Sequence, residues 1–311
     1  MDIWQEQHMN LLNKNYLLDN DYFVNNIKEI YPETGDRWLR DIPIKLNELG
    51  SKWGFQIIRV MPELSYSFVA LVKHKGNDAI LKMAPTEQCL EREIQCLSSF
   101  QKDSPTIFSF DKEHNAALME YIYPGQSLKT LVKTGRDDKA TEVICEIIRE
   151  LRFQNAINYP FKHMAVIAKD LDILIGHFDK TLLDKAINLF HELTQDRSND
   201  ILLHGDLHHD NILSFGDSWK VIDPHGYIGD PVAEVGAMIR NPYDVLPDVP
   251  SKKLLSRRLS ILNNELPYDK NRINAWCYCI SVLSVAWTYE GFSKVNDSDI
   301  ELIKTLNEVC F

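Results

Sequence analysis

The spacing of apolar residues divides the chain into a helical beginning, a stretch of strands and a long, mainly helical remainder. In residues 1–50 the apolar positions recur at helical intervals, at Leu11, Leu12, Tyr16, Leu17, Trp38, Leu39, Ile42, Ile44, Leu46 and Leu49. We therefore expect a helical N-terminal segment that packs on the strands that follow.

Between residues 55 and 122 the pattern becomes that of a small sheet. Runs rich in β-branched and aromatic residues predict strands at 55–60, 67–72 and 79–83, with a turn at 73–78 that contains Gly-Asn-Asp. A helical run follows at 90–100. Residues 116–122 predict a further strand, which ends at a Pro-Gly break.

Residues 126–200 and 250–311 carry a mainly helical pattern. Residues 275–287 are strongly apolar, but this run is shorter than the ~20 residues that a helix needs to cross a membrane. The run therefore predicts a buried helix, and we expect no membrane partner.

The polar residues of segment 203–223 carry the clearest chemical signal. Asn211 follows Asp206 by five positions, and Asp223 ends the second of two strand-like runs, 211–215 and 219–223, which a Gly-Asp-Ser turn joins. Phosphotransferases use this spacing to place a base and two magnesium ligands around a nucleoside triphosphate.

The predicted hairpin brings Asn211 and Asp223 to the same end, where two hard oxygen donors suit Mg²⁺. Asp206, on the preceding loop, is then free to face an acceptor hydroxyl and take its proton as the oxygen attacks the γ-phosphoryl group. The pattern thus predicts an enzyme, a kinase of small molecules, with Asp206 as its catalytic base.

A zinc site and a purely structural turn are weaker assignments for this segment. His204 and His208 stand four residues apart, as zinc-binding histidines do on a helix. However, Gly205 occupies the place where such a zinc hydrolase carries its glutamate, and the loop is not strongly helical. A structural turn would have to produce four correctly spaced features at once.

The amino-acid sequence of this segment is similar to that of a known family. HGDLHHDNIL at 204–213 and IDPHGYIGDPVAEVGAMIRNP at 222–242 resemble the aminoglycoside phosphotransferase family of protein-kinase-like enzymes. They most resemble its streptomycin 6-phosphotransferase and hydroxyurea kinase branch. The likeness extends upstream to GDRW at 35–38, Trp53 and AILK at 79–82, so it covers nearly the whole chain from about residue 35.

The resemblance implies an α+β, bilobal protein-kinase-like fold, with a small antiparallel sheet in the N-terminal lobe and a larger, mainly helical C-terminal lobe. We expect these lobes at residues 1–122 and 123–311. ATP and Mg²⁺ would be the cosubstrates, Asp206 the base, and Asn211 and Asp223 the metal ligands. Gly205 replaces the arginine of protein kinases that docks a phosphorylated activation loop, so we expect no activating phosphorylation.

Lys82 lies on the third predicted strand, where a kinase places the ammonium group that pairs with the α- and β-phosphates. Glu93 follows eleven residues later in the helical run 90–100, as expected for the acid that orients this lysine. Glu91 is a rival on the same helix. We prefer Glu93 because it shares a helical face with the apolar residues that should pack on the sheet.

Two further segments complete the expected nucleotide site. The turn 61–67 lacks the glycines that kinases favour over the phosphates, and Ser65 and Ser67 are its candidate donors. Glu120 and Ile122, at the expected hinge, would offer a backbone carbonyl and amide to adenine.

For the acceptor, the candidate carboxylates near the site are Asp230 and Glu234, with Asp244 and Glu290 more distant. They would bind guanidinium or ammonium groups. Asp230 also precedes Pro231, where it would cap a helix, and we favour that role for it.

Composition changes this picture little. The 311 residues, 44% hydrophobic and 25% charged, leave room for about two domains, and the formal charge of −11 argues against a nucleic-acid partner. The first ten residues show no secretory pattern, and the six cysteines contain no Cys-x-x-Cys pair. We therefore expect a cytoplasmic protein with reduced thiols.

Together these features predict an ATP- and Mg-dependent phosphotransferase whose acceptor is an aminoglycoside or a hydroxyurea-like compound, with a role in antibiotic resistance. A kinase of another small metabolite, such as a sugar, an amino alcohol or a hydroxamate-like compound, is one alternative. A catalytically silent nucleotide-binding regulatory protein is the other, and the complete set of candidate residues disfavours it.

Overall fold

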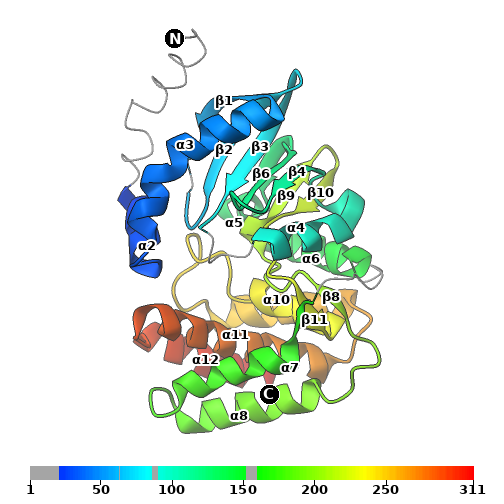
Figure 1. The fold of residues 1–311 in the computed structure, drawn as a ribbon. Helices are drawn as coiled ribbons and strands as arrows, with labels where there is room; N and C mark the ends of the chain where they lie inside the picture. Colours follow the sequence, from blue (N-terminus) through cyan, green and yellow to red (C-terminus); the bar gives the residue numbers. More distant parts are fainter. Residues whose placement is uncertain (1–20, 63, 86–89, 152–159) are drawn as a thin grey trace. The chain divides into compact units, whose positions relative to one another are not determined.

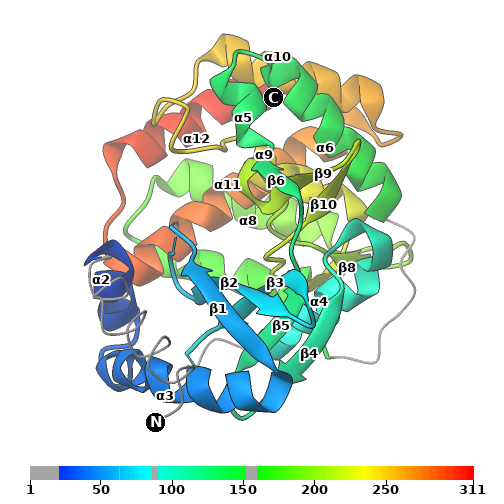
Figure 2. The ribbon, with the colours of Figure 1, turned by 90° about the horizontal axis from the view of Figure 1, so that it is seen from above.

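The computed structural model describes residues 21–62, 64–85, 90–151 and 160–311 (Figures 1 and 2). The chain divides into two compact units, one of Met1–Ile94 with Pro105–Tyr121 and the other of Gln95–Ser104 with Ile122–Phe311. The first contains a sheet and the second is mainly helical, which gives the α+β class that the sequence predicts.

The sheet of the first unit has five antiparallel strands in the order β1-β2-β3-β5-β4 (Figure 2). They are β1 (Phe55–Val60), β2 (Phe68–His74), β3 (Asn77–Met83), β4 (Ile107–Asp111) and β5 (Ala116–Glu120). The four predicted strands are confirmed, whereas the pattern does not predict β4. The turn between β2 and β3 is shorter than expected, because only Lys75 and Gly76, with φ of 49° and 83°, stay outside the strands.

The two faces of this sheet pack against different helices. Helices α2 (Asp21–Ile30) and α3 (Gly35–Trp53) share one buried cluster with Leu81, Met83 and other strand residues (Figure 1). On the opposite face, Ala117 and Met119 pack with Leu90 and Ile94, at the beginning of α4 (Leu90–Phe100). Since side chains alternate along a strand, Lys82 points to the α4 face.

The predicted helical beginning of the chain is confirmed from residue 21 onward. Trp38, Ile42, Leu46 and Leu49 are buried as expected, but Ile44 is 59% exposed because it lies on the outer side of α3. The predicted positions Leu11, Leu12, Tyr16 and Leu17 lie outside the described residues.

The second unit is built mainly from helices. They are α5 (Lys129–Lys133), α6 (Asp137–Leu151), α7 (Met164–Ile167), α8 (Lys180–Leu193), α9 (Val235–Met238), α10 (Lys252–Glu265), α11 (Lys270–Phe292) and α12 (Asp297–Cys310), with the 3-10 turns η1 (Gln101–Asp103), η2 (Ala168–Leu174), η3 (His209–Asn211) and η4 (Pro231–Glu234). Helix α11 contains the predicted buried run, with Trp276 and Tyr278 completely buried.

Two small sheets of the second unit hold the segment with the kinase-like motif. One has the order β10-β9-β6 and the other β7-β11-β8. Their strands are β6 (Pro124–Ser127), β7 (Lys162–His163), β8 (Ile201–Leu203), β9 (Ile212–Phe215), β10 (Ser218–Val221) and β11 (Tyr227–Gly229). Residues 204–211 therefore run from one sheet to the other and residues 222–226 run back, so both stretches are anchored at each end.

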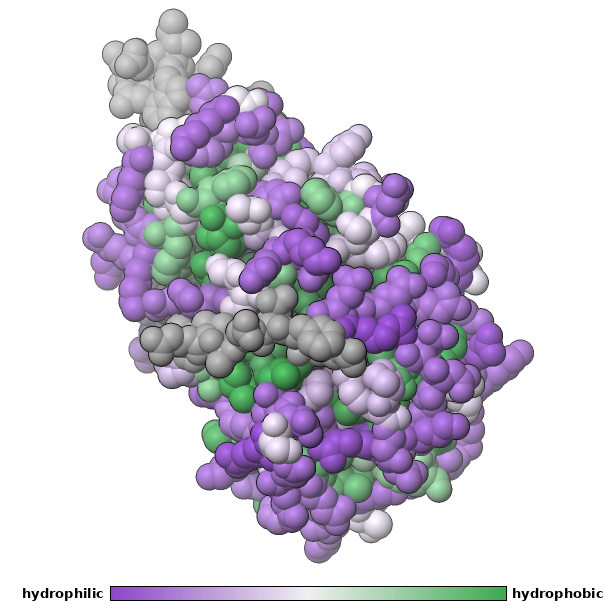
Figure 3. Space-filling view, turned by 90° about the vertical axis from the view of Figure 1, so that its right-hand side faces the viewer, coloured by the Kyte–Doolittle hydropathy of each residue, from purple (hydrophilic) through white to green (hydrophobic). Residues whose placement is uncertain are grey.

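The surface and the thiols of the described residues are ordinary. Hydrophilic residues predominate on the face drawn in Figure 3, and apolar residues are scattered among them. Within the described ranges no helix is long and apolar enough to cross a membrane. Five cysteines are buried, and the sixth, Cys89, lies outside the described residues.

Candidate active site

In the first unit, Lys82 and Glu93 form a buried ion pair. The Nζ atom of Lys82 donates to both carboxylate oxygens of Glu93, at 2.8 and 2.7 Å, and each residue is 7% exposed. The predicted pairing is therefore confirmed. An ammonium group that a carboxylate holds in one place is suited to bind phosphate oxygens.

Glu91, the rival acid, has a different partner. It accepts a hydrogen bond from Nζ of Lys112 at 2.8 Å, in an exposed ion pair next to the end of β4. Residues two apart on a helix do not share a face, so only one of these two acids of α4 can point toward Lys82. The preference for Glu93 over Glu91 is confirmed.

The other predicted nucleotide contacts are backbone segments and serines. Ser65 is exposed, whereas Ser67 is buried just before β2. Glu120 ends β5, and its amide donates to the carbonyl oxygen of Thr106 at 2.9 Å. This amide is committed to the protein, so only the carbonyl group of Glu120 is compatible with the predicted contact to adenine. Ile122 is buried and belongs to the second unit.

In the second unit, Asp206 is surrounded by polar side chains of its own loop and of residues 222–226, the returning segment. Its Oδ2 lies 3.2 Å from Nδ2 of Asn211, 3.4 Å from Nε2 of His208 and 3.9 Å from Nε2 of His225. Burial raises the pKa of Asp206, but the hydrogen bond and charge of His208 and the charge of His225 lower this pKa well below its ordinary value. Asp206 is therefore ionised at neutral pH, with its side chain 26% exposed.

His204 is buried, and the backbone uses both of its ring nitrogens. Nδ1 accepts a hydrogen bond from the amide of Asp206 at 3.3 Å, and Nε2 donates to the carbonyl of Ile222 at 2.9 Å. Burial lowers the pKa of His204 to about 4, which keeps the ring neutral. A zinc ion would need one of these nitrogens, so the geometry gives a zinc site no support.

Asn211 and Asp223 are adjacent at the open end of the β9–β10 hairpin. The amide of Ile222 donates to the carbonyl of Asn211 at 2.9 Å, so the next residue, Asp223, lies directly beside Asn211. Nδ2 of Asn211 donates to the backbone carbonyl of Asp206 at 3.0 Å, which leaves Oδ1 as its atom for a cation. Asp223 is exposed with φ 56°, a left-handed conformation that aspartate adopts more readily than most residues.

This pair of residues fits Mg²⁺. Mg²⁺ takes one or two oxygens from a protein and completes its shell with phosphate oxygens and water. An amide oxygen and a carboxylate at one end of a hairpin supply that number. In the described ranges, no group of three or more His, Cys, Asp or Glu is arranged to hold a metal ion without such help.

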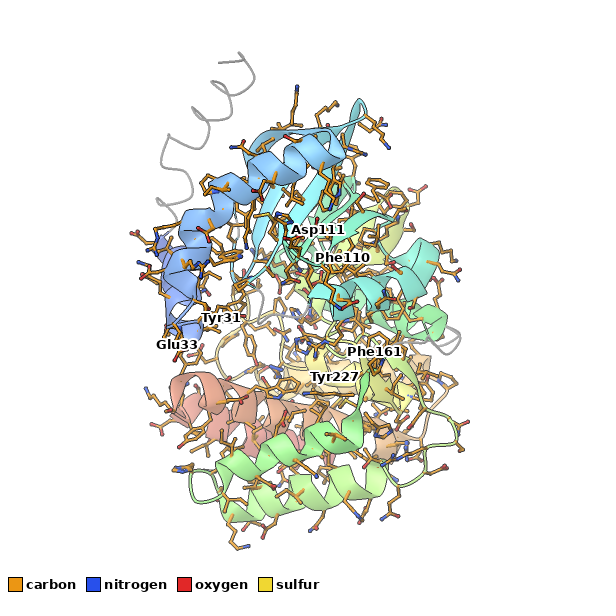
Figure 4. The ribbon with its side chains drawn as sticks, in the orientation of Figure 1. Tyr31, Glu33, Phe110, Asp111, Phe161 and Tyr227 are labelled. Carbon is orange, nitrogen blue, oxygen red and sulfur yellow. The ribbon has the colours of Figure 1, made fainter. Side chains whose placement is uncertain are left out.

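Gly205 has no space for a side chain. Its φ is +78°, and a Cβ atom there would lie 2.7 Å from Cδ2 of Tyr227, which is labelled in Figure 4. Gly226 on the returning segment meets Phe161 in the same way, at 2.8 Å. An aromatic ring thus packs on each glycine, which explains why the arginine of protein kinases cannot stand at position 205.

Glu234 is not placed to bind an acceptor. It is 5% exposed, and its carboxylate accepts hydrogen bonds from the amides of His204, at 2.5 Å, and Gly205, at 3.1 Å. Burial raises the pKa of Glu234 to about 7, although both amides favour its charged form. We therefore replace the predicted acceptor contact by a structural role, in which Glu234 fixes the backbone just before Asp206.

Asp230 has the capping role that the sequence favours. Its Oδ1 accepts a hydrogen bond from the amide of Val232 at the beginning of η4, at 3.0 Å. Its Oδ2 accepts from Arg272 at 2.6 Å and from the indole of Trp276 at 2.5 Å, both on α11. The buried carboxylate is fully used within the protein, so the acceptor role considered for it has no support either.

Comparison with known proteins identifies the family. The family model of the aminoglycoside/hydroxyurea antibiotic resistance kinases matches residues 55–291. The chain belongs to this family. The predicted resemblance is confirmed, and this kinase is an enzyme that transfers phosphate to a hydroxyl group of a small molecule.

A relative with a known activity and several solved structures agree with this assignment. This kinase is 30% identical over 228 residues to the streptomycin 3''-kinase of Klebsiella pneumoniae, an alignment that covers 71% of this chain and 84% of the relative.

Among solved structures, the choline kinase LicA of Streptococcus pneumoniae is 16% identical, covers 87% of this chain and 99% of its own, and has a TM-score of 0.59. An aminoglycoside phosphotransferase in a ternary complex with ADP and hygromycin B is 14% identical, with coverage of 85% and 97% and a TM-score of 0.59. The ethanolamine kinase of Plasmodium vivax is 17% identical, with coverage of 100% and 96% and the same TM-score. These likenesses confirm the predicted protein-kinase-like fold.

The sequence pattern does not predict that His208 contacts the carboxylate of Asp206 in the candidate site of this kinase. The ring lies between two carboxylates, 3.4 Å from Asp206 and 3.5 Å from Asp210, and Asp210 pairs in turn with Lys129 at 2.7 Å. Burial lowers the pKa of His208, but the two carboxylates raise it to about 9. The signal in the sequence is the Asp-x-His-x-Asp spacing at 206–210, whereas from the sequence we weigh His208 only with His204, as a pair of zinc ligands.

Proposed function

We propose that this kinase moves the γ-phosphoryl group of ATP to a hydroxyl group of an aminoglycoside or a hydroxyurea-like compound, and that it thereby confers antibiotic resistance. The observation that supports this most directly is the ionised Asp206, which Asn211 holds at 3.2 Å on a loop that leads into the Asn211–Asp223 pair. The family match and the streptomycin kinase among the relatives favour this class of acceptor.

In this proposal Asp206 is the general base. The acceptor oxygen attacks the γ-phosphorus, a new P–O bond forms, the bond to the ADP oxygen breaks, and the hydroxyl proton passes to the carboxylate of Asp206. Asn211 and His208 orient that carboxylate by contacts of 3.2 and 3.4 Å. Because its pKa is low, Asp206 contributes mainly through its position.

The nucleotide would be bound by groups of the predicted ATP site. Lys82, held by Glu93, would pair with the α- and β-phosphates, Ser65 and Ser67 would line the loop over them, and the backbone of Glu120 and Ile122 would contact adenine. The ion pair supports the first of these roles, and the ADP complex among the similar folds supports nucleotide use. Residues 1–122 would then be the nucleotide-binding lobe of a cytoplasmic enzyme, and residues 123–311 the lobe with the catalytic loop.

Asn211, through Oδ1, and Asp223 would hold Mg²⁺. When bound, the metal neutralises phosphate charge during transfer. Asp223→Ala should therefore weaken magnesium-dependent ATP binding at least about tenfold in a calorimetric titration. Asp217→Ala, which removes an exposed carboxylate from the turn of the same hairpin, is the control and should bind normally. Unchanged Mg-ATP affinity in the Asp223 variant would remove this residue from the site.

A kinase of another small metabolite is the second candidate, because choline and ethanolamine kinases share the fold. A panel of hydroxyl compounds separates these alternatives. The purified protein is incubated with Mg-ATP and aminoglycosides, hydroxyurea, sugars and amino alcohols, and products are detected by mass spectrometry. We expect one added phosphate group on an aminoglycoside or on hydroxyurea. Product only from another class would favour the second candidate, and no product would favour a silent nucleotide-binding protein.

A further inference from the structure

The indole of Trp287 contacts the ring of His225, which in turn neighbours the proposed base, Asp206. Nε2 of His225 is 3.9 Å from Oδ2 of Asp206, and the His225 ring meets the indole of Trp287 with centroids 5.6 Å apart and planes at 73°. Trp287 belongs to α11, far from the catalytic loop in sequence. The fold of the second unit thus brings this indole into contact with the same ring that neighbours the carboxylate of Asp206.

The indole of Trp287 is joined to a carboxylate. Nε1 of Trp287 donates to Oδ2 of Asp170, on η2, at 2.9 Å. Asp170 is exposed and Trp287 is partly buried. Within the described ranges no basic side chain forms an ion pair with Asp170, so its negative charge is not compensated there. Glu290, three residues after Trp287 and therefore on the same side of α11, is exposed and has no ion pair within those ranges either.

Building on the proposed function, we infer that Trp287 and Asp170 determine acceptor specificity by binding a planar cationic group of the guanidinium class. A guanidinium group stacks on an indole face and donates hydrogen bonds to a carboxylate. Oδ2 of Asp170 accepts from the indole, which leaves Oδ1 for a ligand. A neutral acceptor gains neither the cation–π contact nor a hydrogen bond strengthened by its own positive charge. The net charge of −11 also favours the approach of cationic molecules.

The same hydrogen bond between Trp287 and Asp170 connects α11 to η2. An effect of this pair on acceptor selectivity must therefore be distinguished from an effect on the stability of the fold. A purely structural contact would change the thermal stability and all substrates alike. A specificity contact changes the KM of cationic acceptors and leaves the KM of ATP unchanged. The comparison of acceptors therefore decides between the two roles.

The test uses streptomycin, which carries guanidinium groups, and hydroxyurea, which is neutral. Asp170→Asn should raise the KM for streptomycin roughly tenfold, and Trp287→Leu should do the same. Trp287→Phe keeps an aromatic ring and should raise it only about threefold. The KM for ATP should stay within about twofold in all three. Asp172→Asn removes the same charge from an exposed position on the same turn and should leave the KM for streptomycin within about twofold.

Four results would contradict parts of this account in different ways. An unchanged KM for streptomycin in Asp170→Asn overturns the inference. Equal rises in KM for streptomycin, hydroxyurea and ATP overturn it as well, because the pair would then act on the fold. A wild-type protein that phosphorylates only neutral compounds overturns the inference while phosphotransfer stands. A wild-type protein that phosphorylates nothing overturns the proposed function itself.

Discussion

At the scale of single residues, the charges of Lys82 and Asp206 are each held by neighbours of their own unit. Glu93 fixes the ammonium group of Lys82, and Asn211 and His208 orient the carboxylate of Asp206. Such groups are effective because they need no reorganisation when the substrates arrive. They also make the protein sensitive to the loss of one partner.

The Lys82–Glu93 pair should show this sensitivity directly. Lys82→Met or Glu93→Gln alone leaves one member of a buried pair without its partner and should lower the free energy of unfolding by about 3–5 kcal/mol. The double variant should be more stable than Lys82→Met alone, because no buried charge remains. Urea denaturation measures all three proteins, and each should turn over slowly at saturating ATP.

A matched control is Lys73→Met, which removes an exposed ion pair with Asp78 on the same sheet and should cost less than about 1 kcal/mol. Losses that simply add in the double variant would mean that the two residues act independently.

The second residue-scale prediction concerns Gly205. Gly205→Ala should destabilise the protein by backbone strain and by overlap with Tyr227. Gly216→Ala, with φ +57° and no atom within 4 Å of the new Cβ, should show the strain alone. We expect about 1–2 kcal/mol for Gly216 and an additional ~1–3 kcal/mol for Gly205, measured by chemical denaturation. Equal losses at both positions would exclude a contribution from Tyr227.

At the scale of elements, the two small sheets and η4 together fix the catalytic loop. The loop leaves β8 and enters β9, the returning segment leads into β11, and Glu234 at the end of η4 holds the amides of His204 and Gly205. The position of Asp206 therefore depends on a residue almost 30 positions away in the sequence. The burial that this role requires also raises the pKa of the Glu234 carboxyl group.

Glu234 should make stability depend on pH. Its pKa is raised from 4.5 to about 7 in the folded protein, so folding takes up a proton between these pH values. The stability that neutral Glu234 provides is complete below about pH 4.5 and is lost as the pH rises to about 7. Relative to Glu234→Gln, which does not titrate, the wild type should lose up to about 3 kcal/mol across this window and change little above it. Urea unfolding of both proteins at several pH values measures the difference, and parallel curves would contradict the raised pKa.

Elements with a strong local pattern could be predicted from the sequence. The helix at 90–100 and the strand at 55–60 agree with α4 and β1 residue for residue, and the spacing of Asp206, Asn211 and Asp223 predicts the hairpin that joins the last two. The three-residue turn expected in that hairpin is wrong, because Ser218 pairs with Phe215 and only Gly216 and Asp217 remain outside the strands.

The elements that escaped prediction depend on tertiary contacts. Strand β8 has three residues and β7 only two, too few for a periodic pattern. The structural role of Glu234 and the Trp287–Asp170 pair join residues that are 30 and 117 positions apart. A single sequence shows that such residues are polar or aromatic, but it does not show which backbone or side chain they meet.

At the scale of the whole molecule, both units contribute groups to the proposed reaction. Lys82 and Glu93 come from the first, while Asp206, Asn211 and Asp223 come from the second. The family match covers residues of both units, and the similar folds cover 85% or more of the chain. The proposed transfer therefore needs groups of both units, and its central step depends on one carboxylate.

Asp206→Asn tests that step most directly. The amide keeps the shape of the side chain but cannot accept the hydroxyl proton, and a general base contributes ~10²- to 10⁴-fold to the rate. The wild type and the variant are compared for Mg-ATP affinity by calorimetry and for the rate of product formation by mass spectrometry, with the acceptor that reacts best in the panel. The account predicts an Mg-ATP affinity within about twofold of the wild type and a rate at least about 100-fold lower. A variant that forms the phosphorylated product as fast as the wild type would contradict it.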